Sequence, residues 1–228
     1  MKYKFSKDIV AYQEKSVRSQ SLICELLHNA YRTIKSVYMF ENFDEYCRQL
    51  KSDKQEDKLK IYWKTSYDEK LIDNIKISVA FENFNKAVLL KNGIVVHSIN
   101  HKFDKKISSR QKKGIPIKVS ELFENGFESI NLFEKESKNF NAFYENFNTI
   151  NYSSTLNENY QNIIGIEKKL ILELLKINQD RNRLHFFTEF SGAFMVRKHI
   201  EKWNYIMTKS IEIIETEYRN ETKKLKNI

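Results

Sequence analysis

Two segments of the chain place their apolar residues at helical spacing. The first runs from about Ser16 to Phe40 and the second from about Tyr67 to Lys91. In both, apolar side chains recur at three- and four-residue intervals, which puts them on one face of an α-helix. The second segment stops at Asn92-Gly93, a common signal for the end of a helix. We therefore predict two long amphipathic helices.

Helical spacing returns in the second half of the chain. It favours a helix from about Glu158 to Ile177 and a last long helix from about Arg183 to Tyr218, with Asp180 as the N-cap of the latter. A shorter helix is predicted from about Val119 to Glu136. Residues 139–159 are rich in Asn, Tyr and Ser and have no clear period, so a partner-binding loop and a linker both stay open there.

Composition agrees with a helical fold. The 228 residues include only five Gly and one Pro, whereas an all-β domain of this length needs many tight turns built from such residues. The length corresponds to one domain. We predict a single all-α domain, a helical bundle of four to five principal helices.

Several classes of protein are excluded by the same counts. Hydrophobic residues make up 41% of the chain, too much for a disordered protein. Two cysteines cannot build a disulfide framework or a zinc ribbon. No apolar run is long enough to span a membrane, and the first residues do not have the pattern of a secretory signal. We expect a cytoplasmic protein with no membrane partner.

Positive charge is in excess and is locally concentrated. Lys and Arg total 39 against 30 Asp and Glu, a formal net charge of +9. A basic, cytosolic domain most often meets nucleic acid as its polyanion. Residues 102–118 are predicted to be a mobile basic loop that holds the nucleic-acid backbone. Against one acid, Asp104, this loop carries Lys102, Lys105, Lys106, Arg110, Lys112, Lys113 and Lys118.

Motifs for nucleotide-driven chemistry are absent. The chain has neither a glycine-rich phosphate motif of the GxGxxG or GxxxxGK[ST] kind nor a GxSxG nucleophile elbow. His97 and His101 are four residues apart, which is half of a zinc site if the stretch is helical. The alternative interpretation is one packed and one exposed histidine in a loop. We expect no metal and no cofactor.

A second cluster suits phosphate chemistry. Arg181, Asn182, Arg183 and His185 fall within five residues. Arg181 and His185 share one side of a helix at this spacing, and guanidinium groups bind phosphate in a bidentate manner. RNA carries its own nucleophile, the 2′-hydroxyl, so a base and a phosphate-stabilising cation are sufficient for cleavage. The alternative is a surface cluster whose arginines form ion pairs.

The string RNRLHF at residues 181–186 resembles the signature of the HEPN superfamily, and ENFNKAVLLKNG at residues 82–93 resembles an earlier helix of that family. The resemblance implies a helical core over residues 67–220, with residues 1–66 as an N-terminal addition. It also implies a homodimer whose Arg and His residues form a composite, metal-independent ribonuclease site. Members of the family serve in toxin–antitoxin, abortive-infection and anti-phage defence systems, so an antitoxin or sensor protein is an expected partner.

The resemblance assigns roles to the cluster. His185 is the expected general base or acid, and Arg181 stabilises the charge of the phosphorane. Asn182 orients the phosphate or the histidine, and Arg183 holds the RNA backbone. Three residues separate Arg181 from His185, where the usual pattern has four to six. Two functions therefore stay open: an endoribonuclease of HEPN type, and a non-catalytic helical module that binds nucleic acid or a partner protein.

Overall fold

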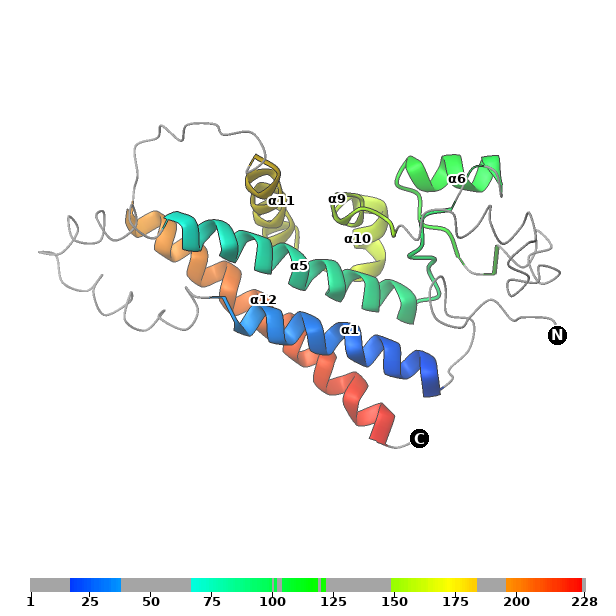
Figure 1. Cartoon of the computed structure of the whole chain (residues 1–228), viewed down its shortest axis with the longest axis horizontal. Helices are drawn as coiled ribbons and strands as arrows, with labels where there is room; N and C mark the ends of the chain where they lie inside the picture. The colour runs from blue at the N-terminus through cyan, green and yellow to red at the C-terminus, as the bar shows by residue number, and fades with distance from the viewer. Residues whose placement is uncertain are drawn as a thin grey trace, which may run out of the picture. The chain divides into compact units, whose positions relative to one another are not determined.

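The computed structural model describes residues 17–37, 67–99, 101, 104–118, 120–121, 149–183 and 196–226. These residues form helices and contain isolated β-bridges in place of strands, so the predicted all-α fold is confirmed. The helices, shown in Figure 1, are α1 (Val17–Lys35), α5 (Tyr67–Lys91), α6 (Lys105–Lys112), α9 (Tyr152–Thr155), α10 (Glu158–Ile164), α11 (Lys168–Arg183) and α12 (Val196–Lys226). Of the described helices, none is long and apolar enough to cross a membrane.

The chain divides into two compact units. The first consists of Met1–Leu27, Glu82–Ile166 and Asn220–Ile228, and the second of His28–Phe81 and Glu167–Arg219. Helices α1, α5 and α12 therefore contribute residues to both units. The sequence-based division into residues 1–66 and 67–220 stays a prediction.

Helix α5 begins and ends where its sequence predicts. Its last turn is closed by Gly93, whose φ of 69° lies in the left-handed region that glycine adopts at low cost. The Gly93 N–H donates to the carbonyl of Leu90 and the Ile94 N–H donates to that of Leu89, both at 2.9 Å. This pair of bonds is the Schellman arrangement, which satisfies carbonyls at the end of a helix.

In the first unit, the chain after α5 runs through a set of short extended segments. Residues 94–99 pair on one side with residues 117–118 and on the other with residues 149–150. The Val95 N–H donates to the carbonyl of Ile117, and the Ile150 N–H donates to that of Val96, each at 2.9 Å. Helix α9 packs against α5 through the buried Asn85 amide, which donates to the Thr155 hydroxyl at 2.8 Å (Figure 1).

Part of the predicted basic loop is a helix, so that prediction is wrong for residues 105–112. Asp104 caps α6 by accepting a hydrogen bond from the Ile107 N–H at 2.9 Å. Ile107 and Gln111 are one turn apart and both are buried. With only one buried apolar residue, Ile107, among so many lysines, the periodic signal is too weak to indicate a helix from sequence.

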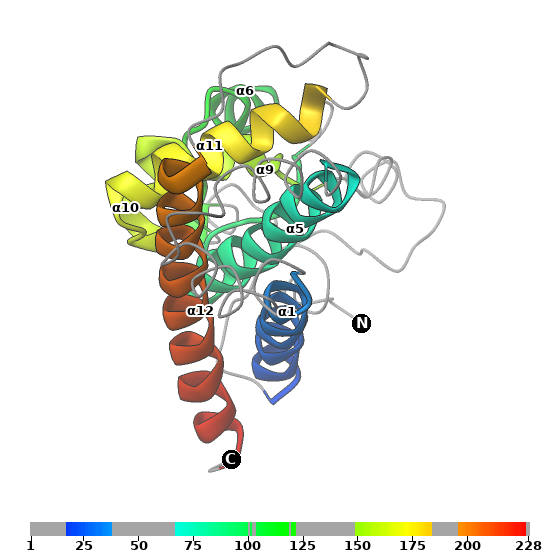
Figure 2. The same cartoon turned by 90° about the vertical axis from the view of Figure 1, so that its left-hand side faces the viewer.

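In the second unit, α11 lies across the N-terminal part of α12 (Figure 2). The Lys202 ammonium on α12 contacts the Glu173 carboxylate on α11 at 2.6 Å. Behind this pair, both helices bury their apolar faces, which should supply most of the stability of the contact. The buried residues are Leu170, Leu174 and Ile177 on α11 and Trp203, Ile206, Met207 and Ile214 on α12.

The predicted helix over residues 158–177 is two helices, because Gly165 interrupts it. Gly165 has a φ of 81°, and its N–H closes α10 by donating to the carbonyl of Gln161 at 2.8 Å. Helix α11 then continues through Arg183, since no Gly or Pro stops it earlier. Asp180 therefore lies near the end of α11. The prediction that it caps the start of the last helix is wrong, because Asp180 lies inside α11.

Candidate nucleic-acid interface

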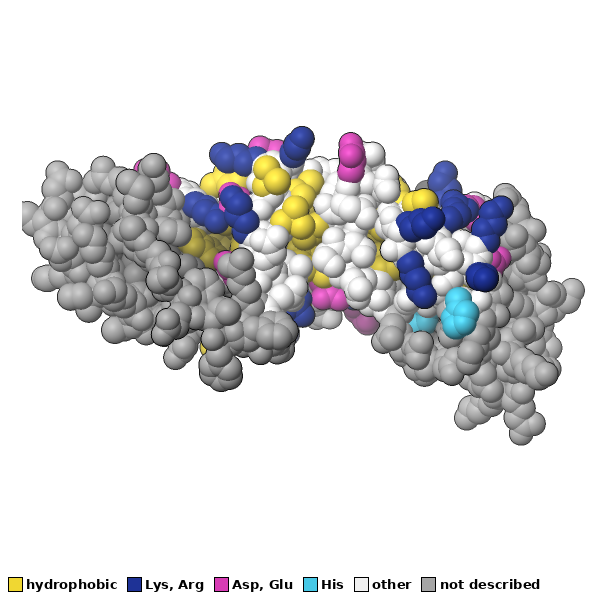
Figure 3. Space-filling model, turned by 90° about the horizontal axis from the view of Figure 1, so that it is seen from above, with side chains coloured by type: hydrophobic (Ala, Val, Ile, Leu, Met, Phe, Trp, Pro, Cys, Tyr) yellow, Lys and Arg dark blue, Asp and Glu magenta, His cyan; other side chains and the backbone are white. Residues whose placement is uncertain are grey.

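Helix α6 separates its lysines from its buried side chains. Ile107, Ser108 and Gln111 face the first unit's interior, whereas the lysines stand in solvent. Figure 3 shows Lys and Arg side chains gathered over this helix. The predicted nucleic-acid-binding residues that are exposed here are Lys105, Lys106, Lys112 and Lys113. Lys102, which was predicted with them, lies outside the described residues.

One of the predicted cations has an acidic partner. The Arg110 guanidinium contacts the Glu121 carboxylate at 2.7 Å, and the Lys118 N–H donates to the same carboxylate at 3.0 Å. Burial by itself raises the pKa of Glu121, but these hydrogen bonds and the nearby positive charges outweigh it and hold the pKa below its ordinary value. Within the described residues, no ion pair involves Lys105, Lys106 and Lys112 of α6 or Lys113 at its C-cap, which together are called the α6 lysines. They are available to a polyanion.

Gln111 fixes α6 against the extended segment before it. Its Nε2 donates to the carbonyl of His97 at 2.8 Å, and its Oε1 accepts from the Ile99 N–H at 2.7 Å. One amide thus satisfies two buried backbone groups that would otherwise be costly. Sequence reasoning missed this residue. The only signal for it in the sequence is its four-residue spacing from Ile107, which places both side chains on one face of a helix.

Gly114 makes the turn that follows α6. Its φ of 75° favours glycine, and a Cβ placed there would lie 2.2 Å from the Asn157 side chain. The amide groups of Asn157 and Asn159 both donate to the Gly114 carbonyl at 3.2 Å. Asn157 also caps α10 by accepting from the Tyr160 N–H at 3.1 Å. This part of the unassigned 139–159 region therefore holds the basic helix in place.

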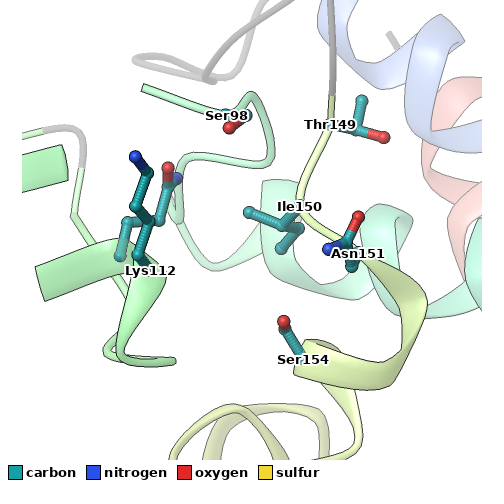
Figure 4. Close-up of a pocket in the computed structure, with 7 residues that line it drawn as sticks. Ser98, Lys112, Thr149, Ile150, Asn151 and Ser154 are labelled. Atoms are coloured by element: carbon teal, nitrogen blue, oxygen red, sulfur yellow. The ribbon is translucent and has the colours of Figure 1, made fainter. Parts of the chain in front are cut away.

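A pocket of about 560 Å³ opens between α6 and the segment that leads into α9. Figure 4 shows Lys112 and Ser98 on one side, with Ile150, Asn151 and Ser154 on the other. Thr149 and Gln111 complete the lining, which contains no acidic residue. Sequence reasoning named only Lys112 here, because the other residues come together through contacts that are distant along the chain.

The two candidate metal ligands have different surroundings. His97 is completely buried and His101 is exposed, as in the alternative interpretation of one packed and one exposed histidine. Within the described residues, no group of three or more His, Cys, Asp or Glu side chains is arranged to hold a metal ion. A shared zinc site at His97 and His101 is therefore not supported.

The catalytic candidates lie only partly in the described residues. Arg181 is half-buried and Asn182 is exposed in the last turn of α11, while His185 and the side chain of Arg183 lie outside the description. Arg181 and Asn182 lie inside α11 and far from its first turn, so α11 does not supply there the free N–H donors expected for phosphate. Among the described residues, no ion pair involves Arg181, and the alternative of ion-paired arginines stays open.

The described surface therefore combines an exposed cationic helix with a polar pocket beside it. Exposed lysines suit the phosphates of a nucleic-acid backbone, and hydroxyl and amide groups suit a sugar or a base edge. Comparison of the chain with protein-family models, with curated proteins and with solved structures found no match.

Proposed function

We propose that this protein binds RNA through the exposed face of α6. The observation that carries the proposal is the row of four exposed lysines, Lys105, Lys106, Lys112 and Lys113, without acidic partners among the described residues. Such a row neutralises backbone phosphates and releases their counterions, which is the main source of affinity for nucleic acid. The choice of RNA over other polyanions rests on the resemblance of residues 181–186 to the HEPN signature.

The rigid attachment of α6 supports the same function. Asp104 caps its start, Gln111 fastens its last turn to residues 97–99, and the Gly114 turn follows its end. The four lysines therefore share one helix face that is set before a ligand arrives. Preorganised charges of this kind cost less entropy on binding than charges on an unrestrained loop.

The test is a fluorescence anisotropy titration of labelled single-stranded RNA at several salt concentrations. We expect the logarithm of the affinity to fall linearly with the logarithm of the salt concentration, with a slope of about 0.7 for each phosphate contacted on a single strand. Binding that does not change with salt, or no binding at low salt, would refute the proposal. A duplex DNA of equal length gives the reference for RNA preference.

A second candidate function, metal-independent RNA cleavage, is favoured by Arg181. This guanidinium is partly exposed and makes no ion pair with another described residue, and the exposed amide of Asn182 follows it. In this proposal His185 removes the proton of the 2′-hydroxyl, whose oxygen attacks the adjacent phosphorus. Arg181 stabilises the phosphorane charge, and the 5′-oxygen leaves with the proton that His185 took from the 2′-hydroxyl. The products carry 2′,3′-cyclic phosphate and 5′-hydroxyl ends.

Cleavage would give the protein the toxin or anti-phage role that the resemblance implies. Its test is incubation with total RNA in excess EDTA, with Arg181→Ala, His185→Ala and the control Arg32→Ala beside the wild type. Arg32 is an exposed arginine on α1 and should be dispensable. We expect the first two substitutions to reduce cleavage by about 100-fold or more. Full activity in His185→Ala, or 3′-hydroxyl products, would contradict this candidate.

A further inference from the structure

The pocket beside α6 has walls that hydrogen bonds hold together. Gln111 ties α6 to residues 97–99, and the Ile150 N–H ties the opposite wall to the carbonyl of Val96 at 2.9 Å. An antiparallel bridge between His97 and Thr149 joins the same two segments. The backbone groups that build the pocket are thus satisfied within the protein. Its shape exists without a ligand.

Several polar side chains that line the pocket are available for a ligand. Asn151 is the N-cap of α9, but its side chain makes no capping hydrogen bond. The hydroxyls of Ser98, Thr149 and Ser154 make no hydrogen bond to any described residue. Figure 4 shows the Ser154 hydroxyl directed toward the space between α9 and α6, with Lys112 across that space. Polar groups in this arrangement can donate to and accept from one small polar molecule.

The lining indicates the chemistry of that molecule. A single ammonium group, Lys112, with no carboxylate among the lining residues, suits one negative charge. Three hydroxyls and an amide suit a polyhydroxylated group, and the buried Ile150 adds an apolar surface. The volume of about 560 Å³ falls within the range of small-ligand sites. A ribonucleotide combines these features, as it has a phosphate, a ribose with hydroxyl groups and a base with an apolar face.

We propose that this pocket binds one ribonucleotide of an RNA strand, with the phosphate at Lys112 and the ribose among Asn151, Ser98 and Ser154. This inference rests on the proposed RNA binding and adds the source of its selectivity. The outward lysines of α6 contact phosphates, which carry no information about the sugar. The pocket supplies the hydrogen-bonding groups that recognise the 2′-hydroxyl, the group that distinguishes RNA from DNA.

The first test uses mononucleotides and backbone amide NMR of the full chain. Adenosine 5′-monophosphate should shift the amide signals of Lys112, Asn151 and Ser154, and 2′-deoxyadenosine 5′-monophosphate should bind about threefold to tenfold more weakly, as expected for one lost hydrogen bond. Equal affinity for the two nucleotides would overturn the ribose assignment. Equal affinity for inorganic phosphate would show an anion site and overturn the nucleotide assignment.

The second test uses matched variants. Asn151→Asp keeps the size of the side chain and adds a charge that repels phosphate, and Ser154→Phe fills the pocket from a half-buried position. Ser109→Ala, at an exposed position of α6 outside the pocket lining, is the control. We expect both pocket variants to weaken adenosine 5′-monophosphate binding at least about tenfold and to remove the preference for RNA over DNA, while the control keeps that preference.

The two proposals fail in different ways. If both pocket variants keep the wild-type preference for RNA, and neutralising the α6 lysines still weakens RNA binding, the pocket inference is wrong and RNA binding stands. If the wild type binds neither RNA nor the mononucleotide at low salt, both are wrong. Melting temperatures of the variants show whether any loss reflects unfolding.

Discussion

The surface of α6 and the surface formed by α11 and α12 are both rich in positive charge. They differ in whether their lysines are paired with carboxylates. On α11 and α12, Glu173 is paired with Lys176 at 3.0 Å and with Lys202 at 2.6 Å, and Lys209 is paired with Glu212 at 2.8 Å. On α6, the four exposed lysines have no carboxylate partner in the described chain. A net charge of +9 therefore does not locate a binding surface. The two surfaces differ in that Lys176, Lys202 and Lys209 are paired with carboxylates, whereas the α6 lysines are not paired with any described residue.

The difference has a local cause. Along α11 and α12, glutamates recur three or four residues from lysines or arginines, the spacing at which helical neighbours pair. The sequence of α6, KKISSRQK, contains no acid at all. Its two neighbouring acids have other tasks, because Asp104 caps the helix and Glu121 binds Arg110.

The largest expected effect comes from reversing two α6 charges. Lys112→Glu with Lys113→Glu should weaken single-stranded RNA binding by on the order of 100-fold at low salt, because two attractive phosphate contacts become repulsive. Fluorescence anisotropy measures the change. The control, Lys176→Glu with Arg219→Glu, makes the same change in net charge on paired, exposed residues of α11 and α12. An equal loss of RNA affinity in the two variants would contradict the claim that α6, and not α11 and α12, binds RNA.

The next largest effect concerns the turn that positions α6. Gly114→Ala should destabilise the protein by about 2 kcal/mol or more, since the substitution combines a positive φ with a contact of 2.2 Å to Asn157. Gly93→Ala also has a positive φ but meets nothing within 4 Å, so it should cost only about 1 kcal/mol. Urea unfolding compares the two variants. A smaller loss of unfolding free energy for Gly114→Ala than for Gly93→Ala would contradict the close contact between Gly114 and Asn157.

Removing the amide of Gln111 has a smaller expected effect. Gln111→Ala leaves the His97 carbonyl and the Ile99 N–H without their partner, which should cost about 1–3 kcal/mol of unfolding free energy. Ser109→Ala, at an exposed position of the same helix, should be nearly neutral. Hydrogen exchange at the Ile99 amide reports directly on its bond to Gln111. Unchanged protection of that amide in Gln111→Ala would show that Gln111 does not hold α6 against residues 97–99.

The smallest effect is a pH-dependent one at Glu121. Its pKa is lowered in the folded protein, so its contribution to stability is present above the ordinary value of 4.5 and is lost as the pH falls through the folded pKa. Arg110 is 38% exposed, so solvent screening reduces the contribution of the pair to about 0.2–1 kcal/mol. Urea unfolding of Glu121→Gln should show this loss at neutral pH, and none at acidic pH.

Glu121→Gln should also release Arg110 and strengthen RNA binding by about twofold. Glu173→Gln is the matched control, because hydrogen bonds and charges from Lys202 and Lys176 outweigh burial and likewise lower the pKa of Glu173. It should lose stability with the same dependence on pH but leave RNA binding unchanged. A gain in RNA affinity from Glu173→Gln would place the binding surface on α11 and α12.

Local signals explain which parts of the fold the sequence predicts. Helix α5 has a sustained apolar period and a glycine stop signal, and its predicted bounds are confirmed. The predicted end of α11 at Ile177 was wrong, because its helix-forming sequence continues through Asp180 and Arg181. Helix α6 was missed, since only Ile107, Ser108 and Gln111 face inward.

The candidate site likewise has a part that the sequence predicts and a part that it does not. The lysines of α6 were visible as a charge excess in one short stretch. The pocket residues were not, because Ser98, Lys112 and Asn151 become neighbours only through the pairing of distant segments. The catalytic roles of Arg181, Asn182 and His185 stay a prediction.

The most direct test of RNA binding by α6 compares the salt dependence of two neutralised proteins. The first carries Gln at Lys105, Lys106, Lys112 and Lys113. The second carries Gln at Lys86, Lys176, Lys209 and Lys224, each of which is paired with a carboxylate. The slope of log affinity against log salt should fall by about 3 in the first protein and by less than about 1 in the second. Equal slopes in the two proteins would contradict the claim that α6 is the RNA-binding surface.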